Sequence, residues 1–247
     1  MRKILSILFF LPFACNGQTY ELLGVYNGST GTPITFTGKT AVFVGDSYMA
    51  APWCTGSVTI PSYFATVTSS TATNLGISGQ VLQNDVSTCS PARTVFDQTT
   101  IPTYVDGTHS VLFIALGTND VGVNNGDMTP ADFETTLEST ITYASDTKGW
   151  PLKRIIVVTS YYTAQAGRDL YVGDCGVTVA ADATRLVAYV NAAISAASDA
   201  GTNLLDIYQV QVDTGSPASL LAGDSLHPNA TGADLIATTM ATTIFYL

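Results

Sequence analysis

The sequence predicts a three-layer α/β/α fold built on one doubly wound parallel sheet of five strands. Five short apolar runs are spread along the chain, and amphipathic or alanine-rich helical patterns separate them. Continuous apolar runs of this length are typical of strands buried on both faces, as in parallel sheets. Alternating strands and helices indicate right-handed βαβ units, whose helices cover the two faces of the sheet.

The five predicted strands begin well inside the chain and end at its last fifth. They are Ala41–Val44, Thr73–Ile77, Val111–Leu116, Arg154–Thr159 and Asn203–Ile207. The first and third are followed directly by glycines, Gly45 and Gly117. The second has the weakest apolar pattern of the five, so its position is the least constrained.

Helices are expected between the strands. A first helix is predicted within residues 58–70, and Thr129 is predicted to be the N-cap of another, with Pro130 at its first position and Asp132 at its third. Apolar residues then recur every four positions on one helical face. These are Phe133, Leu137 and Ile141, then Leu186, Val190 and Ile194 within residues 180–200, and Ile236, Met240 and Ile244 within residues 229–247.

The N-terminal segment is typical of a secretory signal peptide, predicted to span residues 1–17. Two basic residues precede the apolar run Ile4–Phe13, which is too short to span a bilayer, and small residues follow. Cleavage after Gly17 would release the mature chain. Acylation of Cys15, as in a lipoprotein, is the alternative. We therefore expect a secreted or periplasmic protein without stable membrane insertion.

The mature chain is predicted to hold one domain. Residues 18–40 are rich in Gly and Thr without a clear period and are expected to form an extended lead-in. Residues 41–247 contain no internal repeat and no dividing linker, so we expect a single domain there. The oligomeric state is not predicted.

Charge excludes several classes of partner. Only 11% of residues are charged, and the formal net charge is −10. No basic patch is available to neutralise phosphates, which argues against nucleic acid as a partner. The same negative charge argues against anionic membrane surfaces and strongly anionic substrates.

Three cysteines remain after the predicted cleavage: Cys54, Cys89 and Cys175. Export permits disulfides, and we favour Cys54–Cys89, because both cysteines lie in loops after the first two predicted strands. The alternative is that all three are unpaired. The chain has two histidines and no Cys-x-x-Cys, so no zinc or other metal site is predicted.

Polar clusters follow the predicted strands and precede the last helix. They are Gly45–Tyr48, Asn74–Gln80, Gly117–Asp120 and Asp224–Asn229. In open parallel sheets, ligands bind outside the carboxyl ends of the strands. We therefore expect these clusters to lie along one edge of the sheet and to form the functional site.

The residue types in these clusters suit acyl transfer. Ser47 becomes a nucleophile if His227 takes its proton, and Asp224, three residues earlier, can accept the Nδ1–H and fix the imidazole tautomer. The developing oxyanion needs hydrogen-bond donors. The backbone N–H groups of Ser47 and Gly79 and the side-chain amide of Asn119 are predicted to supply them.

In combination these clusters resemble the blocks of the SGNH hydrolases, also called the GDSL esterase/lipase family. Gly45-Asp46-Ser47-Tyr48 matches the first block with Tyr in place of Leu, and Gly79 matches the glycine of the second. Gly117-Thr118-Asn119-Asp120 matches the third block, and Asp224-Ser225-Leu226-His227-Pro228 matches the fifth, with Ser225 where glycine is common. The resemblance covers roughly residues 41–247.

The resemblance implies a flavodoxin-like sheet with strand order 2-1-3-4-5. It also implies Ser47, His227 and Asp224 as the catalytic triad, and Ser47, Gly79 and Asn119 as the oxyanion hole. The family mostly hydrolyses esters, including acyl lipids, short-chain esters and O-acetyl groups on sugars. Neither a metal nor an organic cofactor is implied.

We therefore predict a secreted serine esterase that acts on a small ester or an acylated carbohydrate. Trp53, Tyr161 and Tyr162 are candidates for exposed aromatics beside a carbohydrate, although such aromatics are more often buried in the core. Other functions remain open: a non-catalytic glycan-binding surface module on the same fold, or a lipid-directed lipase or acyltransferase. A flavodoxin-like cofactor binder is disfavoured, because the acidic Asp46 suits a phosphate poorly.

Overall fold

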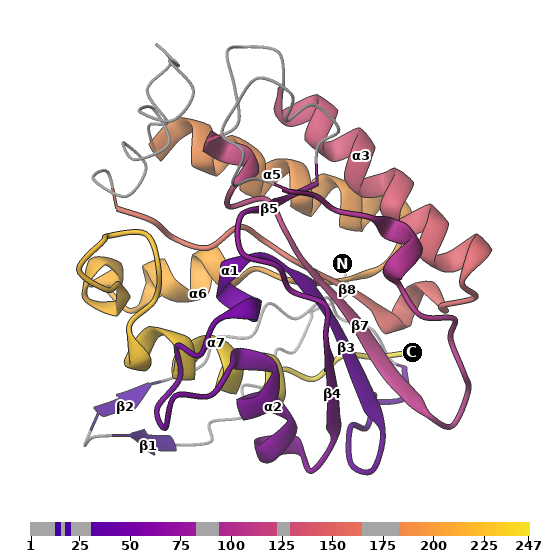
Figure 1. The fold of residues 1–247 in the computed structure, drawn as a ribbon, viewed down its shortest axis with the longest axis horizontal. Coiled ribbons are helices and arrows are strands. Elements are labelled where there is room, and N and C mark those ends of the chain that lie inside the picture. The colour runs from indigo at the N-terminus through magenta and orange to yellow at the C-terminus, as the bar shows by residue number, and fades with distance from the viewer. Residues whose placement is uncertain (1–12, 16–17, 21–30, 83–93, 123–128, 165–182) are drawn as a thin grey trace, which may run out of the picture.

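A five-stranded parallel sheet forms the centre of the molecule (Figure 1). The computed structural model describes residues 13–15, 18–20, 31–82, 94–122, 129–164 and 183–247. The strands are β3 (Thr40–Gly45), β4 (Thr71–Asn74), β7 (His109–Ala115), β8 (Ile155–Val158) and β9 (Asn203–Leu205). Their spatial order is β4-β3-β7-β8-β9, and every pairing is parallel. This confirms the order 2-1-3-4-5.

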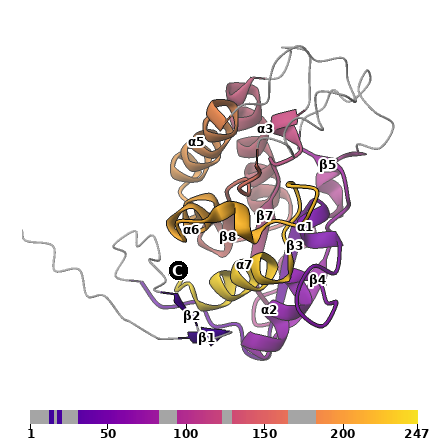
Figure 2. The ribbon, with the colours of Figure 1, turned by 90° about the vertical axis from the view of Figure 1, so that its left-hand side faces the viewer.

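Helices cover both faces of the sheet, which gives the expected three layers (Figure 2). One layer holds α3 (Pro130–Thr142) and α5 (Ala183–Ala200), and the other holds α2 (Ile60–Thr68) and α7 (Ala230–Thr242). Side chains alternate across a strand, so Val42 and Val44 pack in the core beneath α3 and α5, while Ala41 and Phe43 pack toward α2 and α7. Burial on both faces explains why the strand reads as a continuous apolar run.

Shorter elements complete the described part of the chain. The short helices are α1 (Ser47–Ala50), α6 (Ile207–Asp213), the 3₁₀ turns Gln98–Thr100, Asp120–Gly122, Leu152–Arg154 and Pro217–Leu220, and a π turn at Tyr143–Thr147. Two small sheets pair β1 (Phe13–Cys15) with β2 (Gln18–Tyr20) and β5 (Gln80–Val81) with β6 (Thr94–Val95).

The predicted cap of α3 is confirmed in detail. The Thr129 hydroxyl accepts a hydrogen bond from the Asp132 N–H at 3.2 Å, and the Asp132 carboxylate accepts one from the Thr129 N–H at 2.9 Å. This reciprocal capping box satisfies two amide groups that a helix start leaves without partners. The apolar stripe Phe133, Leu137 and Ile141 is buried against the sheet, as the spacing predicts.

Several element ends differ from the sequence prediction; for example, β9 ends at Leu205, because the predicted last strand residue, Ile207, begins α6. Strand β4 ends at Asn74, whose side chain accepts from the Gly76 N–H and donates to the Met49 carbonyl, and so turns the chain out of the sheet. Helix α7 ends at Thr242, and Ile244 is 59% exposed rather than part of the apolar face. The chain after α7 is extended, because it pairs with the predicted lead-in, where the Ile34 N–H donates to the Phe245 carbonyl.

Cys54 is a free thiol, so the favoured Cys54–Cys89 disulfide is not formed in this structure. The side chain is 2% exposed and lies beside Asp234. Burial, reinforced by the charge of Asp234 and a hydrogen bond with it, raises the pKa of the Cys54 thiol to about 12, which favours the protonated thiol. Cys89 and Cys175 lie outside the described residues.

The two boundaries predicted near the N-terminus, at residues 17 and 40, stay predictions. Most of residues 1–30 lie outside the described part of the chain. Within the described part, every helix is too short or too polar to cross a membrane.

Candidate active site

The four polar clusters are linked to one another at the carboxyl edge of the sheet. The Ile77 N–H donates to the Gly45 carbonyl at 3.1 Å, which joins the loop after β4 to the end of β3. The Asn119 amide donates to the Gln80 carbonyl at 3.0 Å, which joins the loop after β7 to the same region. The loop before α7 joins through His227, which contacts Ser47.

Local geometry explains why Gly-Asp-Ser stands at the end of β3. A Cβ on Gly45 would lie 2.4 Å from the Met49 side chain, so only glycine fits there. Asp46 is fully buried and caps α1 by accepting the Tyr48 N–H at 3.0 Å. Ser47 is therefore the first residue of a helix that begins immediately after a buried strand, and its hydroxyl faces the edge where His227 lies.

Ser47, His227 and Asp224 form one chain of hydrogen bonds. The Ser47 Oγ lies 2.9 Å from the His227 Nε2, and the His227 Nδ1 lies 2.6 Å from the Asp224 Oδ2. The two partners of the second contact remain partly open to solvent, with 22% of the His227 side chain and 39% of the Asp224 side chain exposed. The structure thus brings together all three residues that the sequence analysis assigned to the triad.

The Asp224 carboxylate also shapes the loop that carries the histidine. Its Oδ1 accepts the backbone N–H groups of Leu226 and His227, at 3.0 and 2.9 Å. Ser225 lies in the left-handed region at φ 59°, which explains why glycine is common at this position. Partial burial acts to raise the pKa of Asp224, but hydrogen bonds from the His227 ring and from both N–H groups outweigh it and hold the pKa below its ordinary value.

The proposed oxyanion donors come from three elements. Gly79 has a φ of 77°, a conformation that glycine adopts without a steric cost. Within the described residues, the N–H groups of Ser47 and Gly79 make no hydrogen bond, so both can serve a ligand. The bond from Asn119 Nδ2 to the Gln80 carbonyl uses one of the two amide hydrogens and fixes the orientation of the amide plane.

The Gly-Thr-Asn-Asp block is buried and ties neighbouring loops together. At Gly117, with φ 123°, a Cβ would lie 2.6 Å from the Ser160 hydroxyl. The Thr118 hydroxyl accepts the Tyr161 N–H, and the Asp120 carboxylate accepts the Leu82 N–H. These bonds fix the loops on both sides of Asn119, so its amide sits in a rigid frame.

Aromatic side chains surround the triad in a way that the sequence analysis missed. Tyr161 is 1% exposed and stacks on Tyr48, with ring centroids 3.9 Å apart, so it is not an exposed sugar platform. Tyr162 and Trp53 are half-buried. The Tyr48 hydroxyl donates to the Leu226 carbonyl at 2.5 Å, and Trp53 stacks on His227. The one signal in the sequence was Tyr48 at a position where the family usually has Leu.

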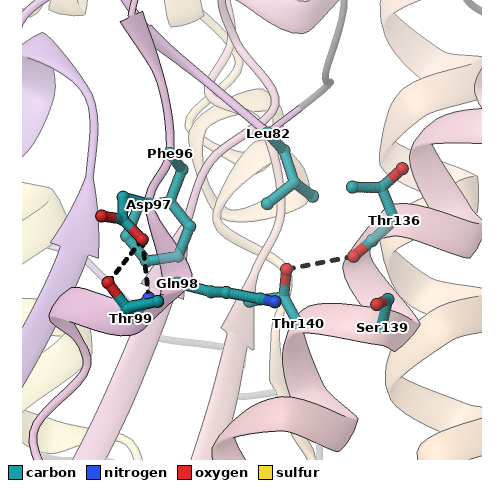
Figure 3. Close-up of a pocket in the computed structure, with 8 residues that line it drawn as sticks. All are labelled: Leu82, Phe96, Asp97, Gln98, Thr99, Thr136, Ser139 and Thr140. Carbon is teal, nitrogen blue, oxygen red and sulfur yellow. Dashed lines mark hydrogen bonds between the residues drawn. The ribbon is translucent and has the colours of Figure 1, made fainter.

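Other polar sites are separate from the triad. A cavity of about 220 Å³ lies between α3 and the segment after β6 (Figure 3). It is lined by Leu82, Phe96, Asp97, Gln98, Thr99, Thr136, Ser139 and Thr140. Asp97 accepts the Thr99 N–H within its own turn, and the Thr140 hydroxyl donates to the Thr136 carbonyl one turn earlier on α3. Three acidic residues lie close together on α3 and α5: Glu134, Glu138 and Asp199. They are partly or fully exposed, and exposed acidic groups often gather in this way without binding a metal ion.

Comparison with known families identifies one match over most of the chain. The model of the GDSL-like lipase/acylhydrolase family matches residues 43–235, a range that contains Ser47, Asp224 and His227. A search of curated proteins finds no match.

Several solved structures share the fold. A lipase/acylhydrolase from Enterococcus faecalis has a TM-score of 0.60 at 17% identity, covering 82% of this chain and 93% of that one. A carbohydrate acetylesterase family member from Sinorhizobium meliloti has a TM-score of 0.58 at 15% identity, with coverages of 82% and 95%. Axe2, an acetylxylan esterase from Geobacillus stearothermophilus, has a TM-score of 0.52 at 19% identity, with coverages of 83% and 93%.

Proposed function

Because this chain belongs to the GDSL-like lipase/acylhydrolase family, whose members are carboxylic ester hydrolases, we propose that it is a serine esterase that uses Ser47, His227 and Asp224. The observation that carries this proposal is the continuous chain of hydrogen bonds through the three side chains. A nucleophile, a base and an orienting carboxylate within hydrogen-bond reach are what acyl transfer through serine requires.

In the acylation step, the His227 Nε2 takes the proton from the Ser47 Oγ while the oxygen forms a bond to the carbonyl carbon of the ester. The carbonyl π electrons move to oxygen, and the oxyanion is stabilised by the N–H groups of Ser47 and Gly79 and by the Asn119 amide. When the intermediate collapses, the bond to the alcohol oxygen breaks. His227 gives its proton to that oxygen, and the alcohol leaves.

In the second step, water replaces the alcohol. His227 accepts a proton from the water as it attacks the acyl carbon, and the bond to the Ser47 Oγ breaks. His227 then returns its proton to Ser47, which releases the acid and restores the enzyme. Asp224 stays ionised throughout and stabilises the imidazolium that forms in each step. Its lowered pKa supports that role.

We propose short acyl groups, such as O-acetyl on carbohydrate, as the substrate class. Two of the similar structures support this choice, since one is an acetylxylan esterase and the other a carbohydrate acetylesterase family member. The low proportion of charged residues and the net charge of −10 suit a neutral acylated sugar better than an anionic substrate.

We also propose that the protein is exported and that residues 1–17 are removed. The basic start and the short apolar run Ile4–Phe13 support this. Cell fractionation followed by N-terminal sequencing tests it. A mature chain that begins at Gln18 outside the cytoplasm is expected, and an intact N-terminus in the cytoplasm would contradict export.

The esterase proposal is tested with p-nitrophenyl acetate, butyrate and palmitate, together with acetylated xylan. We expect the acetate to be the best p-nitrophenyl ester, acetate release from the polysaccharide, and no turnover by Ser47→Ala. A preference for palmitate would instead indicate a lipase. No turnover by the folded parent would contradict the esterase proposal and favour a glycan-binding module or an acyltransferase.

A further inference from the structure

The catalytic histidine contacts a tryptophan that lies only six residues after the nucleophile. The Trp53 ring is stacked on the His227 imidazole, with centroids 4.7 Å apart and an interplanar angle of 18°. The same side chain donates its indole N–H to the Ser47 carbonyl at 2.7 Å. One half-buried residue therefore contacts both the backbone of the nucleophile and the ring of the base, which is 180 residues away from Ser47 in the chain.

From this geometry, and resting on the proposed esterase function, we propose that Trp53 is a positioning residue. It holds the plane of the His227 ring in line with Ser47 and stabilises the imidazolium that forms during turnover.

The hydrogen bonds of His227 do not by themselves hold the tilt of its ring. The bonds to Ser47 and Asp224 lie in the plane of the imidazole, so they restrain rotation within that plane more than tilting out of it. The Tyr48 hydroxyl holds the backbone of the loop at Leu226, and the Tyr48 ring is tilted by 41° to the imidazole with centroids 6.1 Å apart, so it does not stack on the ring face. A flat partner packed against the ring face supplies the remaining restraint, and Trp53 is placed as that partner.

The stack also has an electrostatic effect. His227 is neutral before the reaction and positively charged after it has taken the Ser47 proton. A cation near the face of an indole ring is attracted by the ring quadrupole, more strongly where water is partly excluded. Because this attraction exists only once the charge has formed, it lowers the barrier without tightening substrate binding.

The expected effect is on kcat and not on KM. Loss of a cation–π contact of the strength seen at partly buried sites corresponds to roughly a 3- to 30-fold decrease in rate. Trp53→Leu removes both the aromatic face and the N–H donor, so we expect kcat for p-nitrophenyl acetate to fall about tenfold, with KM within about twofold of the parent. Trp53→Phe keeps an aromatic face and should recover most of that loss.

The second tryptophan of the chain is a matched control. Trp150 also stacks on a histidine, His109, at 5.2 Å and 28°, and its indole N–H also donates to a carbonyl, that of Pro102. His109 lies at the start of β7, so this pair is outside the carboxyl-edge site. Trp150→Phe should lower the melting temperature and leave kcat within about twofold of the parent.

Fluorescence tests the contact itself, even if Trp53→Leu fails to fold. In a Trp150→Phe background, Trp53 is the one remaining tryptophan. Because an imidazole stacked on an indole quenches its emission strongly when the imidazole is protonated, adding His227→Ala should brighten Trp53 in acidic buffer. Unchanged emission would overturn the proposed contact.

A phosphorylating reagent separates this inference from the esterase proposal. Diethyl p-nitrophenyl phosphate reacts with a serine activated by its histidine and needs no matching acyl group. We expect Trp53→Leu to slow phosphorylation of Ser47 about tenfold. This measurement can be made even if the parent turns over none of the esters tested. Equal phosphorylation rates in parent and variant, equal losses in Trp53→Phe and Trp53→Leu, or a rise in KM alone would overturn the role of Trp53.

Discussion

The substitution Asp224→Asn tests the tautomer argument, because it changes one atom of the triad and keeps the loop. Asp224 Oδ1 accepts two backbone N–H groups, whereas Oδ2 faces the His227 Nδ1. An asparagine must turn its oxygen toward the two backbone donors, which places its NH₂ against Nδ1. That NH₂ group can only donate, so the ring proton moves to Nε2. A protonated Nε2 cannot take the proton of Ser47.

The size of this effect follows from the exposure of the carboxylate. In a buried triad, the wrong tautomer costs about 10⁴ in kcat. Asp224 is 39% exposed, so water competes at Nδ1 and relieves part of the loss. We expect kcat for p-nitrophenyl acetate to fall by about 10²–10⁴-fold, with the melting temperature within about 4 °C of the parent.

The control for this variant is Asp97→Asn. Asp97 is exposed and also accepts a backbone N–H in a tight turn, that of Thr99 at 2.9 Å, so it loses the same charge in a similar setting. It should keep full activity. If Asp224→Asn also keeps kcat within about threefold of the parent, the tautomer argument is refuted and Asp224 only shapes the loop.

Three other measurements follow. Asn119→Ala should lower kcat by roughly 10²–10³ as an oxyanion donor, and an effect on KM alone would make it a binding residue. Gly79 has a φ of 77°, so Gly79→Ala should lower the free energy of unfolding in urea by about 1–2 kcal/mol and should also lower kcat. A variant as stable as the parent would contradict the expected backbone strain. Burial lowers the pKa of His109 below its usual 6.5, and the Val105 N–H donates to its Nδ1. The unfolded chain therefore binds a proton at this histidine more readily than the folded chain does. The free energy of unfolding should fall as the pH drops below about 6.5. His109→Gln should reduce that dependence, and an identical pH dependence in both proteins would count against it.

Much of the fold was predictable because its signals are local. The apolar runs at Val42–Val44 and Val111–Leu116 are buried on both faces, so every side chain in them is apolar. The α3 cap is encoded by three neighbouring residues, Thr129, Pro130 and Asp132.

Element ends that depend on distant partners were predicted less well. Strand β4 stops at Asn74 because the Asn74 side chain bonds to Met49, in another segment. Ile244 has the right spacing for the apolar face of α7, yet the chain there pairs with residues 32–34 instead. The periodicity of one segment cannot show that a distant segment will pair with it and end its helix.

The residues of the proposed triad were predictable because each lies within a short recognisable block: Ser47 begins α1 directly after β3, and Asp224 and His227 lie in the loop before α7. The stacking of Trp53 on His227 was not, since the two residues are far apart in the chain and no spacing rule connects them. Burial of Tyr161 agrees with the more common reading of such an aromatic, but a tyrosine after a strand gives no sign of which ring covers it, and here that ring is Tyr48.

The central claim, that Ser47 is the nucleophile, is tested most directly by covalent labelling. The chain would be treated with diethyl p-nitrophenyl phosphate, digested, and sequenced by mass spectrometry while residual esterase activity is followed. We predict one diethyl phosphoryl group per chain, on Ser47, appearing in step with the loss of activity and strongly slowed in His227→Ala. Activity that survives full labelling of Ser47, or a label on another residue that tracks the loss of activity, would contradict the claim.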